Sequence, residues 1–313
     1  MQFSVNNRKD EALMLTAKLI KDKARELGAV LCGIGDIKYF DGDDMQKNPL
    51  SILPNAKCII GCALPVPKGF YKTMEEKAQF YTYTSMGVKY IDETFAEIFL
   101  LKLGNMIEDE GYDACLQRNV PGMRIKGDKT TNPEVKSTYE LVHANPVEDG
   151  KPTPDVIIDT NKAARVCGLG SVGLHGKVIT PEYGTYLRFV YIITDAPLEC
   201  DAPFSDDLCD RCGECIKACP GNAISEDGTD TWQCSVYYRG AHKSNPFIKD
   251  DFLKDHPERD AILNGEKKFD SESAKELYPH LRFLPETHFG YVPCLCGKKC
   301  ELACRKHFKG ESV

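Results

Sequence analysis

The sequence predicts an α/β (α+β) protein in which a larger sheet domain precedes a smaller cysteine-rich module. Helical and strand patterns alternate over about the first two hundred residues, which indicates a sheet covered by helices. After Pro197 the cysteines become dense and the core-forming runs become sparse. We therefore expect an α/β domain over residues 1–198. The cysteine-rich module should cover residues 199–313, with a charged insertion of short helices at about 241–290.

Each element of the sheet domain has its own pattern. Apolar residues recur at helical spacing and predict a helix that ends at Gly28; they are Leu15, Leu19, Ile20 and Leu27. A second helix is predicted over residues 93–111. Continuous apolar runs between turn residues predict buried strands at 29–35 and 57–66. Further strands are expected at 112–117, 155–159 and 186–195. Residues 159–167 should form a helix capped by Asp159 or Thr160.

The composition of the chain excludes some classes of function. No stretch approaches the roughly 20 apolar residues that span a membrane, and the N-terminal "MQFSVNNRKDEALML" lacks an export signal, so we expect a cytoplasmic protein. The net charge of −7 argues against a nucleic-acid partner. Without an export signal, fifteen cysteines indicate metal or redox chemistry rather than disulfides.

One cysteine run has the spacing of a ferredoxin. The segment "CDRCGECIKACP" places cysteines at C-x2-C-x2-C-x3-C-P, at Cys209, Cys212, Cys215 and Cys219. In this pattern three thiolates hold one 4Fe–4S cluster and the fourth binds the other. Zinc sites usually present paired knuckles separated by a longer loop, so the spacing favours iron–sulfur clusters.

A second group, "CLCGKKCELAC", completes the ligands. Two 4Fe–4S clusters need eight thiolates, and nine candidates are present when Cys234 is included. By ferredoxin logic, the first cluster is held by Cys209, Cys212, Cys215 and Cys304. The second is held by Cys219, Cys234, Cys300 and one more cysteine. We prefer Cys296, with Cys294 as the alternative, because spacing hardly separates them. The alternative for Cys234 is a small buried residue near Trp232.

A glycine-rich segment, "GLGSVG", has the form of a dinucleotide-binding motif. It follows a predicted helix, whereas that motif should follow a strand, so we do not expect a nicotinamide cofactor. A glycine-lined loop that lets a bulky cofactor approach the backbone remains open.

The run "AARVCGLGSVGLHGKVITPEYGTYLRFVYIITDAPL", followed by the ferredoxin run, resembles the epoxyqueuosine reductases and reductive dehalogenases. The resemblance covers most of the chain and is strongest from Gly168 to Pro220. It implies a nitroreductase-like domain that binds a corrinoid (cobalamin), followed by a ferredoxin-like module with two 4Fe–4S clusters. The cofactor-binding residues that it implies are Gly168, Gly170, Gly173, Thr180, Tyr183, Gly184 and Arg188.

The chain also departs from both families. Leu174 stands where the reductases have a lysine and the dehalogenases an arginine, and Arg305 replaces a proline after the last cysteine. We therefore expect neither of the two families' substrates, but a different small-molecule substrate. The expected partners are that substrate and an external electron donor such as ferredoxin or flavodoxin, with no membrane and no nucleic acid.

Reduction also requires a proton donor. Asp159 in "IIDT" resembles an aspartate of the epoxyqueuosine reductases, but a helix N-cap is an equally good interpretation. Tyr83 and Tyr90 are the rivals, because a phenol is protonated at neutral pH. Asn119 matches a dehalogenase asparagine and would orient the substrate.

These observations predict an oxidoreductase of an anaerobic cytoplasm. In it, electrons would pass from two 4Fe–4S clusters to cobalamin and then to the substrate. The alternative is an electron-transfer adaptor, or a corrinoid-handling protein, with no substrate chemistry of its own.

Overall fold

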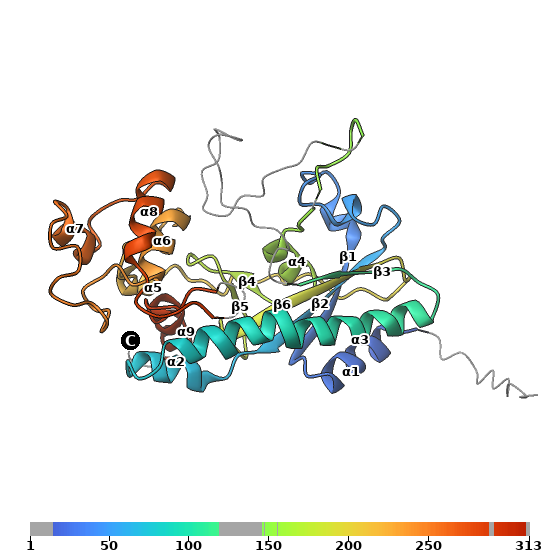
Figure 1. Ribbon diagram of the computed structural model, residues 1–313. Helices are drawn as coiled ribbons and strands as arrows, with labels where there is room; N and C mark the ends of the chain where they lie inside the picture. Colours follow the sequence, from blue (N-terminus) through green and yellow to red (C-terminus); the bar gives the residue numbers. More distant parts are fainter. Residues whose placement is uncertain (1–14, 119–145, 147, 155, 288–290, 311–313) are drawn as a thin grey trace, which may run out of the picture.

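A four-stranded antiparallel sheet forms the centre of the computed structural model, which describes residues 15–118, 146, 148–154, 156–287 and 291–310. The strand order is β1-β2-β6-β3, so the second and sixth strands lie inside the sheet (Figure 1). The strands are β1 (Leu31–Asp36), β2 (Cys58–Pro65), β3 (Ala114–Gln117) and β6 (Leu187–Thr194). Residues of β2 and β6 are buried almost throughout, as continuous apolar runs covered on both faces should be.

Helices α1 (Ala17–Glu26) and α3 (Ala96–Asp109) cover one face of this sheet (Figure 1). The hydroxyl of Thr16 accepts a hydrogen bond from the Leu19 N–H and starts α1. Leu27 caps its end, and Gly28 follows with a φ of 107°, a backbone conformation that favours glycine. The predicted end of this helix is thus where the structure has it.

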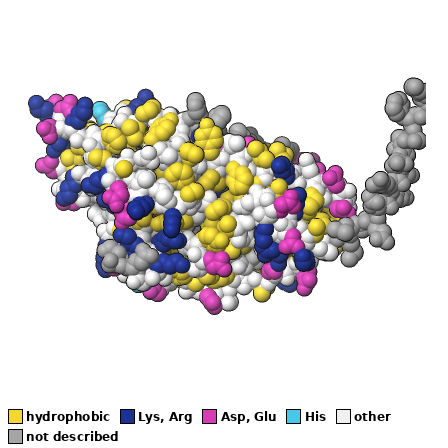
Figure 2. Space-filling model, turned by 90° about the horizontal axis from the view of Figure 1, so that it is seen from below, with side chains coloured by type: hydrophobic (Ala, Val, Ile, Leu, Met, Phe, Trp, Pro, Cys, Tyr) yellow, Lys and Arg dark blue, Asp and Glu magenta, His cyan; other side chains and the backbone are white. Residues whose placement is uncertain are grey.

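A π-helical segment, η3 (Tyr83–Phe95), runs directly into α3 and was not predicted from the sequence. Tyr83, Val88 and Ile91 of this segment join the core beneath the sheet. The outer side of the combined helix exposes Phe95, Ile98 and Leu101, and hydrophobic side chains gather on this face in Figure 2. Since π-helical turns are uncommon, periodicity alone gives no signal for them.

Helix α4 (Thr160–Val166) covers the opposite face, where it packs with Phe40, Ile59 and Tyr191. The strand expected at 155–159 is wrong for the described residues 156–159, which form no strand. There the N–H groups of Ile157 and Asp159 donate to the Gln46 and Lys47 carbonyls at 3.4 and 3.3 Å, so the segment only lies beside a loop.

Shorter elements occur elsewhere among the described residues. They include α2 (Lys68–Glu75), β4 (Ser171–Val172), β5 (Val178–Ile179), α5 (Glu214–Ala218), β7 (Ile224–Ser225), β8 (Gly228–Thr229), α6 (Thr231–Tyr238), α7 (Arg259–Asn264), α8 (Ser271–Leu277) and α9 (Lys299–Lys309). Helices α6 and α8 share a small core around Trp232 and Tyr237. The mixed α/β class is confirmed, whereas the domain division after residue 198 stays a prediction. Among the described residues, no helix has the length and apolar content needed to cross a membrane.

Candidate functional site

Four of the predicted ligands line one small cavity between α5 and α9. Cys209, Cys212 and Cys215 approach it from the loop before α5 and from α5 itself, and Cys304 approaches it from α9. Burial, followed by the charges of the other three thiols, raises the pKa of Cys304 to about 12, which places the four sulfur atoms near one another. This is the set that ferredoxin spacing assigns to the first cluster.

The loop is tight because two residues beside Cys212 have left-handed backbones. Arg211 has a φ of 58° and Gly213 a φ of 77°. Leu174 packs against Cys215 and Ile224 at the wall of this cysteine group. The position at which both resembling families carry a cation is therefore an apolar wall of the candidate metal centre in this chain.

The second cysteine group lies deeper. Cys219 ends α5, Cys234 lies on α6, and Cys296 and Cys300 flank the start of α9. Burial, followed by the charges of Cys296 and Cys219, raises the pKa of Cys234 to about 11. Burial also raises the pKa of Cys300 well above its ordinary value, with contributions from Cys296 and Cys234. These mutual effects favour one site that contains all four thiols.

Cys294 and Cys296 differ in their surroundings. The N–H of Cys294 donates to the Thr84 hydroxyl at 2.9 Å, and its side chain is fully buried in the core beneath the sheet. Its sulfur lies 3.6 Å from that of Cys296. Because Cys296 interacts with Cys234 and Cys300, the arrangement favours Cys296 as the ligand, and the assignment remains a prediction.

A buried ion pair ties the second group to the sheet domain. Lys298, between Cys296 and Cys300, donates to Glu301 at 2.8 Å, and the Tyr71 hydroxyl donates to the same carboxylate at 3.0 Å. The sequence analysis did not identify this pair. A doublet of lysines within a cysteine group was the available signal.

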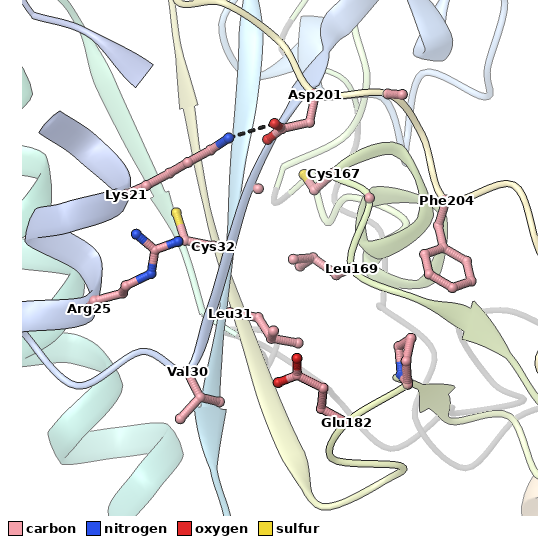
Figure 3. A pocket seen from close by; sticks show the side chains of 14 residues that line it. Lys21, Arg25, Val30, Leu31, Cys32, Cys167, Leu169, Glu182, Asp201 and Phe204 are labelled. Atoms are coloured by element: carbon pink, nitrogen blue, oxygen red, sulfur yellow. Dashed lines mark hydrogen bonds and ion pairs between the residues drawn. The ribbon is translucent and has the colours of Figure 1, made fainter. Parts of the chain in front are cut away.

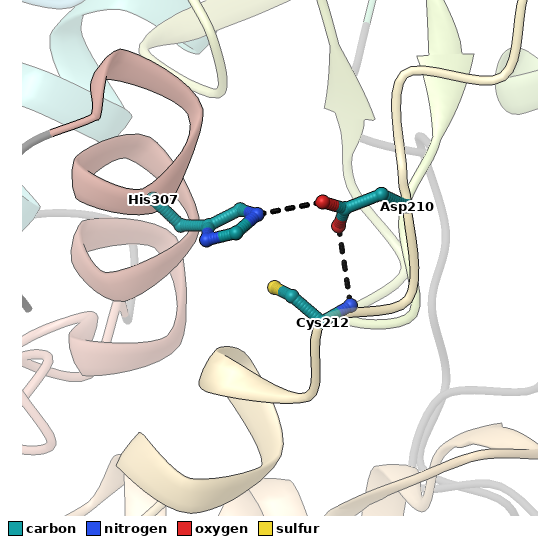
Figure 4. Close-up of side chains that lie close together, drawn as sticks. All are labelled: Asp210, Cys212 and His307. Carbon is teal, nitrogen blue, oxygen red and sulfur yellow. Dashed lines mark hydrogen bonds and ion pairs between the residues drawn. The ribbon is translucent and has the colours of Figure 1, made fainter.

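An exposed cluster of Asp210, Cys212 and His307 lies at the outer edge of the first group (Figure 4). The Nε2 atom of His307 lies 2.7 Å from Oδ2 of Asp210, whose other oxygen accepts from the Cys212 N–H at 3.1 Å. These groups are close enough to share a metal ion. However, Cys212 belongs to the predicted cluster ligands, so the Asp210–His307 contact is better explained as a link between the loop and α9.

The glycines predicted to bind the cofactor let the chain pack against itself. A Cβ added at Gly170 would lie 2.1 Å from the Ile179 carbonyl oxygen, and one at Gly168 would lie 2.9 Å from that of Ala202. At Gly173 the nearest atom would be Cδ1 of Ile179, at 2.9 Å. Close backbone approach is therefore real at these positions, but the neighbour is protein.

The other predicted cofactor residues also make internal contacts. Thr180 is buried, accepts from the Tyr183 N–H at 3.3 Å and bridges to Gly184, whose φ is 59°. Arg188 forms an ion pair with buried Asp92. In the same segment, the buried hydroxyl of Thr185 has no hydrogen-bond partner among the described residues.

One end of this segment lines a cavity of about 400 Å³ at the edge of β1 (Figure 3). Gly168, Glu182 and Cys32 are among the residues that line it, and Cys32 lies on β1. Lys21 bridges to Asp201 at 2.5 Å at its rim. Pockets of this size hold a small ligand, so this cavity alone does not enclose a corrinoid.

The structure separates the candidate proton donors. Tyr83 is buried under the sheet, where burial raises the pKa of its phenol, while Tyr90 is exposed. Asp159 caps α4 on the other face, with one oxygen that accepts from the N–H groups of Asn161 and Lys162 at 3.0 Å. Asn119 lies outside the described residues.

Comparisons with known proteins agree with the cysteine pattern. The 4Fe–4S binding domain family (Fer4) matches residues 202–225, which confirms 4Fe–4S binding. Epoxyqueuosine reductase of Bacillus subtilis strain 168 is 25% identical over 225 residues, covering 70% of this chain and 48% of that protein. The chain thus spans about half the length of this relative.

Two solved structures were also compared. An epoxyqueuosine reductase with a tRNA-Tyr epoxyqueuosine-modified stem loop has a TM-score of 0.46 at 16% identity, over 93% of this chain and 81% of that one. A catabolic reductive dehalogenase has a TM-score of 0.47 at 19% identity, over 71% and 29%.

The expectation of a small-molecule substrate and no nucleic acid is wrong. These relatives are epoxyqueuosine reductases, and one such enzyme was solved with an epoxyqueuosine-modified tRNA stem loop, so that relative binds a nucleic acid. Net charge misled the prediction because it sums over the whole surface and does not report a local site. By sequence, the chain is a relative of the epoxyqueuosine reductases that contains a 4Fe–4S binding domain.

Proposed function

We propose that this protein is a corrinoid-dependent iron–sulfur reductase that acts on a substrate carried by a nucleic acid. The observation that carries the proposal is the convergence of eight cysteines into two adjacent groups beside the segment 168–188. The similarity to epoxyqueuosine reductases supports the reaction type.

The two cysteine groups suit a path for electrons from the surface to the interior. Cys212 is exposed, so an external donor can approach the first group from solvent. The second group is more deeply buried and borders the core of the sheet domain through Cys296 and Leu302. Lys298 lies between Cys296 and Cys300 in the sequence, and its buried ion pair with Glu301 fixes the start of α9 beside this group.

A bound corrinoid would supply the metal that transfers these electrons to the substrate. The orphaned hydroxyl of Thr185 fits such a group, since a buried hydroxyl without a partner is costly and a corrinoid carries amide side chains. Thr185, together with Thr180, Tyr183 and Gly184, would hold it at the turn before β6. Arg188 would act through Asp92, by fixing the start of β6 against η3.

We place the proton donor at a tyrosine. Asp159 uses its carboxylate to cap α4, which is a sufficient structural role. Tyr83 keeps its proton because burial raises its pKa, and Tyr90 offers an exposed phenol. Tyr83→Phe and Tyr90→Phe, each with intact clusters, separate the two: the donor's variant should lose turnover by at least about 100-fold.

The decisive experiment is anaerobic turnover with reconstituted protein, cobalamin, a chemical reductant and a tRNA-Tyr stem loop that contains epoxyqueuosine. We expect a base-off cobalamin spectrum and a reduced nucleoside detectable by mass spectrometry, both dependent on cobalamin. A Cys212→Ala variant, which weakens the first cluster, is the matched control and should slow turnover. If cobalamin leaves the spectrum unchanged and no nucleoside is reduced, the protein is an electron-transfer adaptor instead.

A further inference from the structure

His175 lies in the turn between β4 and β5 and is 5% exposed. It lines the same small cavity as Cys209, Cys212, Cys215 and Cys304. The turn is closed by a hydrogen bond from the Gly173 N–H to the Lys177 carbonyl at 3.0 Å. The hydroxyl of Thr229 donates to the Leu174 carbonyl at 3.3 Å, which fixes the turn against β8 of the cysteine-rich module.

The hydrogen bonds of His175 define its tautomer. The backbone N–H of Lys177 donates to Nδ1 at 3.1 Å, so Nδ1 is an acceptor. A neutral imidazole with an acceptor at Nδ1 carries its proton on Nε2. This Nε2 is buried and has no hydrogen-bond partner within the described part of the chain. A buried donor without an acceptor destabilises the fold, so an acceptor is expected beside this nitrogen.

The residues around the ring fit this role. A Cβ added at Gly173 would lie 3.2 Å from Nε2 and 3.1 Å from Cε1, so a side chain at this position would crowd the ring. Leu174 packs on Cys215 and closes the wall beside the ring with apolar surface. The polar side chains of Asp210 and His307, which also line the cavity, already pair with each other. A cluster held by the four cysteines would bring sulfur atoms, which accept hydrogen bonds, into this cavity beside the ring.

We propose that Nε2–H of His175 donates a hydrogen bond to a sulfur of the first cluster, the one held by Cys209, Cys212, Cys215 and Cys304. This inference rests on the cluster of the proposed function and adds a positioning residue to it. Hydrogen bonds to cluster sulfurs are one of the factors that set reduction potential. Because the donor stabilises the more negative, reduced state, it raises the potential of this cluster relative to the same cluster without it.

The test is a redox titration of the anaerobic holoprotein followed by electron paramagnetic resonance. We expect His175→Phe to shift the midpoint of one cluster to a lower potential and to leave the other unchanged. Pulsed measurements in D2O should show an exchangeable deuteron coupled to the reduced wild-type cluster and its loss in His175→Phe. His175→Gln, whose amide can still donate, should restore part of the potential. If His175→Phe loses its cluster, His175→Gln serves in its place to test the hydrogen bond.

The exposed His280→Phe is the matched control and should behave as wild type. Full iron content with an unchanged potential and deuteron coupling in both His175 variants would overturn the inference, and a buried water would then satisfy Nε2. Absence of iron from the reconstituted wild-type protein would instead overturn the cluster itself, and with it the proposed function.

Discussion

The Nε atom of Arg188 lies 2.8 Å from Oδ1 of Asp92, which joins the start of strand β6 to the C-terminal part of η3. The Asp92 side chain is 1% exposed, and that of Arg188 is 20% exposed. The charge of Asp92 opposes the cost of burying Arg188 and keeps the pKa of the guanidinium above its ordinary value. The basic residue expected to contact a cofactor is therefore a fixed part of the sheet domain.

Removing one partner of this pair should destabilise the fold. Asp92→Ala leaves a largely buried guanidinium without its carboxylate, and we expect a loss of about 3 kcal/mol in the free energy of unfolding. Anaerobic urea unfolding followed by circular dichroism measures it. Asp22→Ala, which breaks an exposed pair with Lys18 on α1, should leave the free energy of unfolding close to that of wild type. Equal losses in the two variants would contradict this view of Arg188.

The two cysteine groups predict separable clusters. Reconstituted wild-type protein should bind about eight irons per chain, as two 4Fe–4S clusters require. Cys304→Ala should retain about four irons and the resonance of one cluster only, since Cys304 lines the cavity of the first group. Cys115→Ala, on β3, should retain all the iron. Zinc in place of iron, or loss of both clusters from Cys304→Ala alone, would argue against two independent sites.

The choice between Cys294 and Cys296 is tested in the same way. We expect Cys296→Ala to lose the second cluster, because this thiol interacts with Cys234 and Cys300. Cys294→Ala should keep its iron and lose stability by about 1 kcal/mol or more, because the side chain is fully buried. The opposite pattern of iron loss would make Cys294 the ligand.

Features that depend on residues close together in the chain could be predicted from the sequence, whereas features that depend on distant residues could not. Local sequence patterns predict the strands β2 and β6, the end of α1 before Gly28 and the Asp159 cap of α4, because each of these depends on neighbours in the chain. Cysteine spacing likewise suffices to bring Cys304 to the ferredoxin run. The position of Arg188 could not be predicted, because it depends on Asp92, nearly a hundred residues away in the chain.

The site shows the same limit. Leu174 was identified only as a departure from a family pattern, while its place against Cys215 comes from tertiary packing. His175, the next residue, gave no signal, because a single histidine in a glycine-rich turn is common. Its role can be inferred only from the structure, which places it next to the Lys177 N–H and in the cysteine cavity.

Acid sensitivity should come in part from His242, a buried histidine between α6 and α7. Burial, and then the charge of Lys299, lowers its pKa from 6.5 to about 4. The neutral ring keeps the contact of its Nδ1 with the Ser244 hydroxyl at 2.8 Å. In the unfolded chain the residue regains an ordinary pKa and binds a proton below about pH 6.5. Its contribution to stability is therefore complete above that pH and is lost as the pH falls toward 4.

Between about pH 7.5 and 5.5 this residue alone should reduce the free energy of unfolding by about 1 kcal/mol. The window avoids the stronger acid that would destroy iron–sulfur clusters. His242→Gln should remove this part of the pH dependence, whereas the exposed His280→Gln should leave it as in wild type. Anaerobic urea unfolding at the two pH values provides the comparison. If wild type and His242→Gln lose the same stability on acidification, His242 is protonated in the folded protein and its burial does not exclude the charged form.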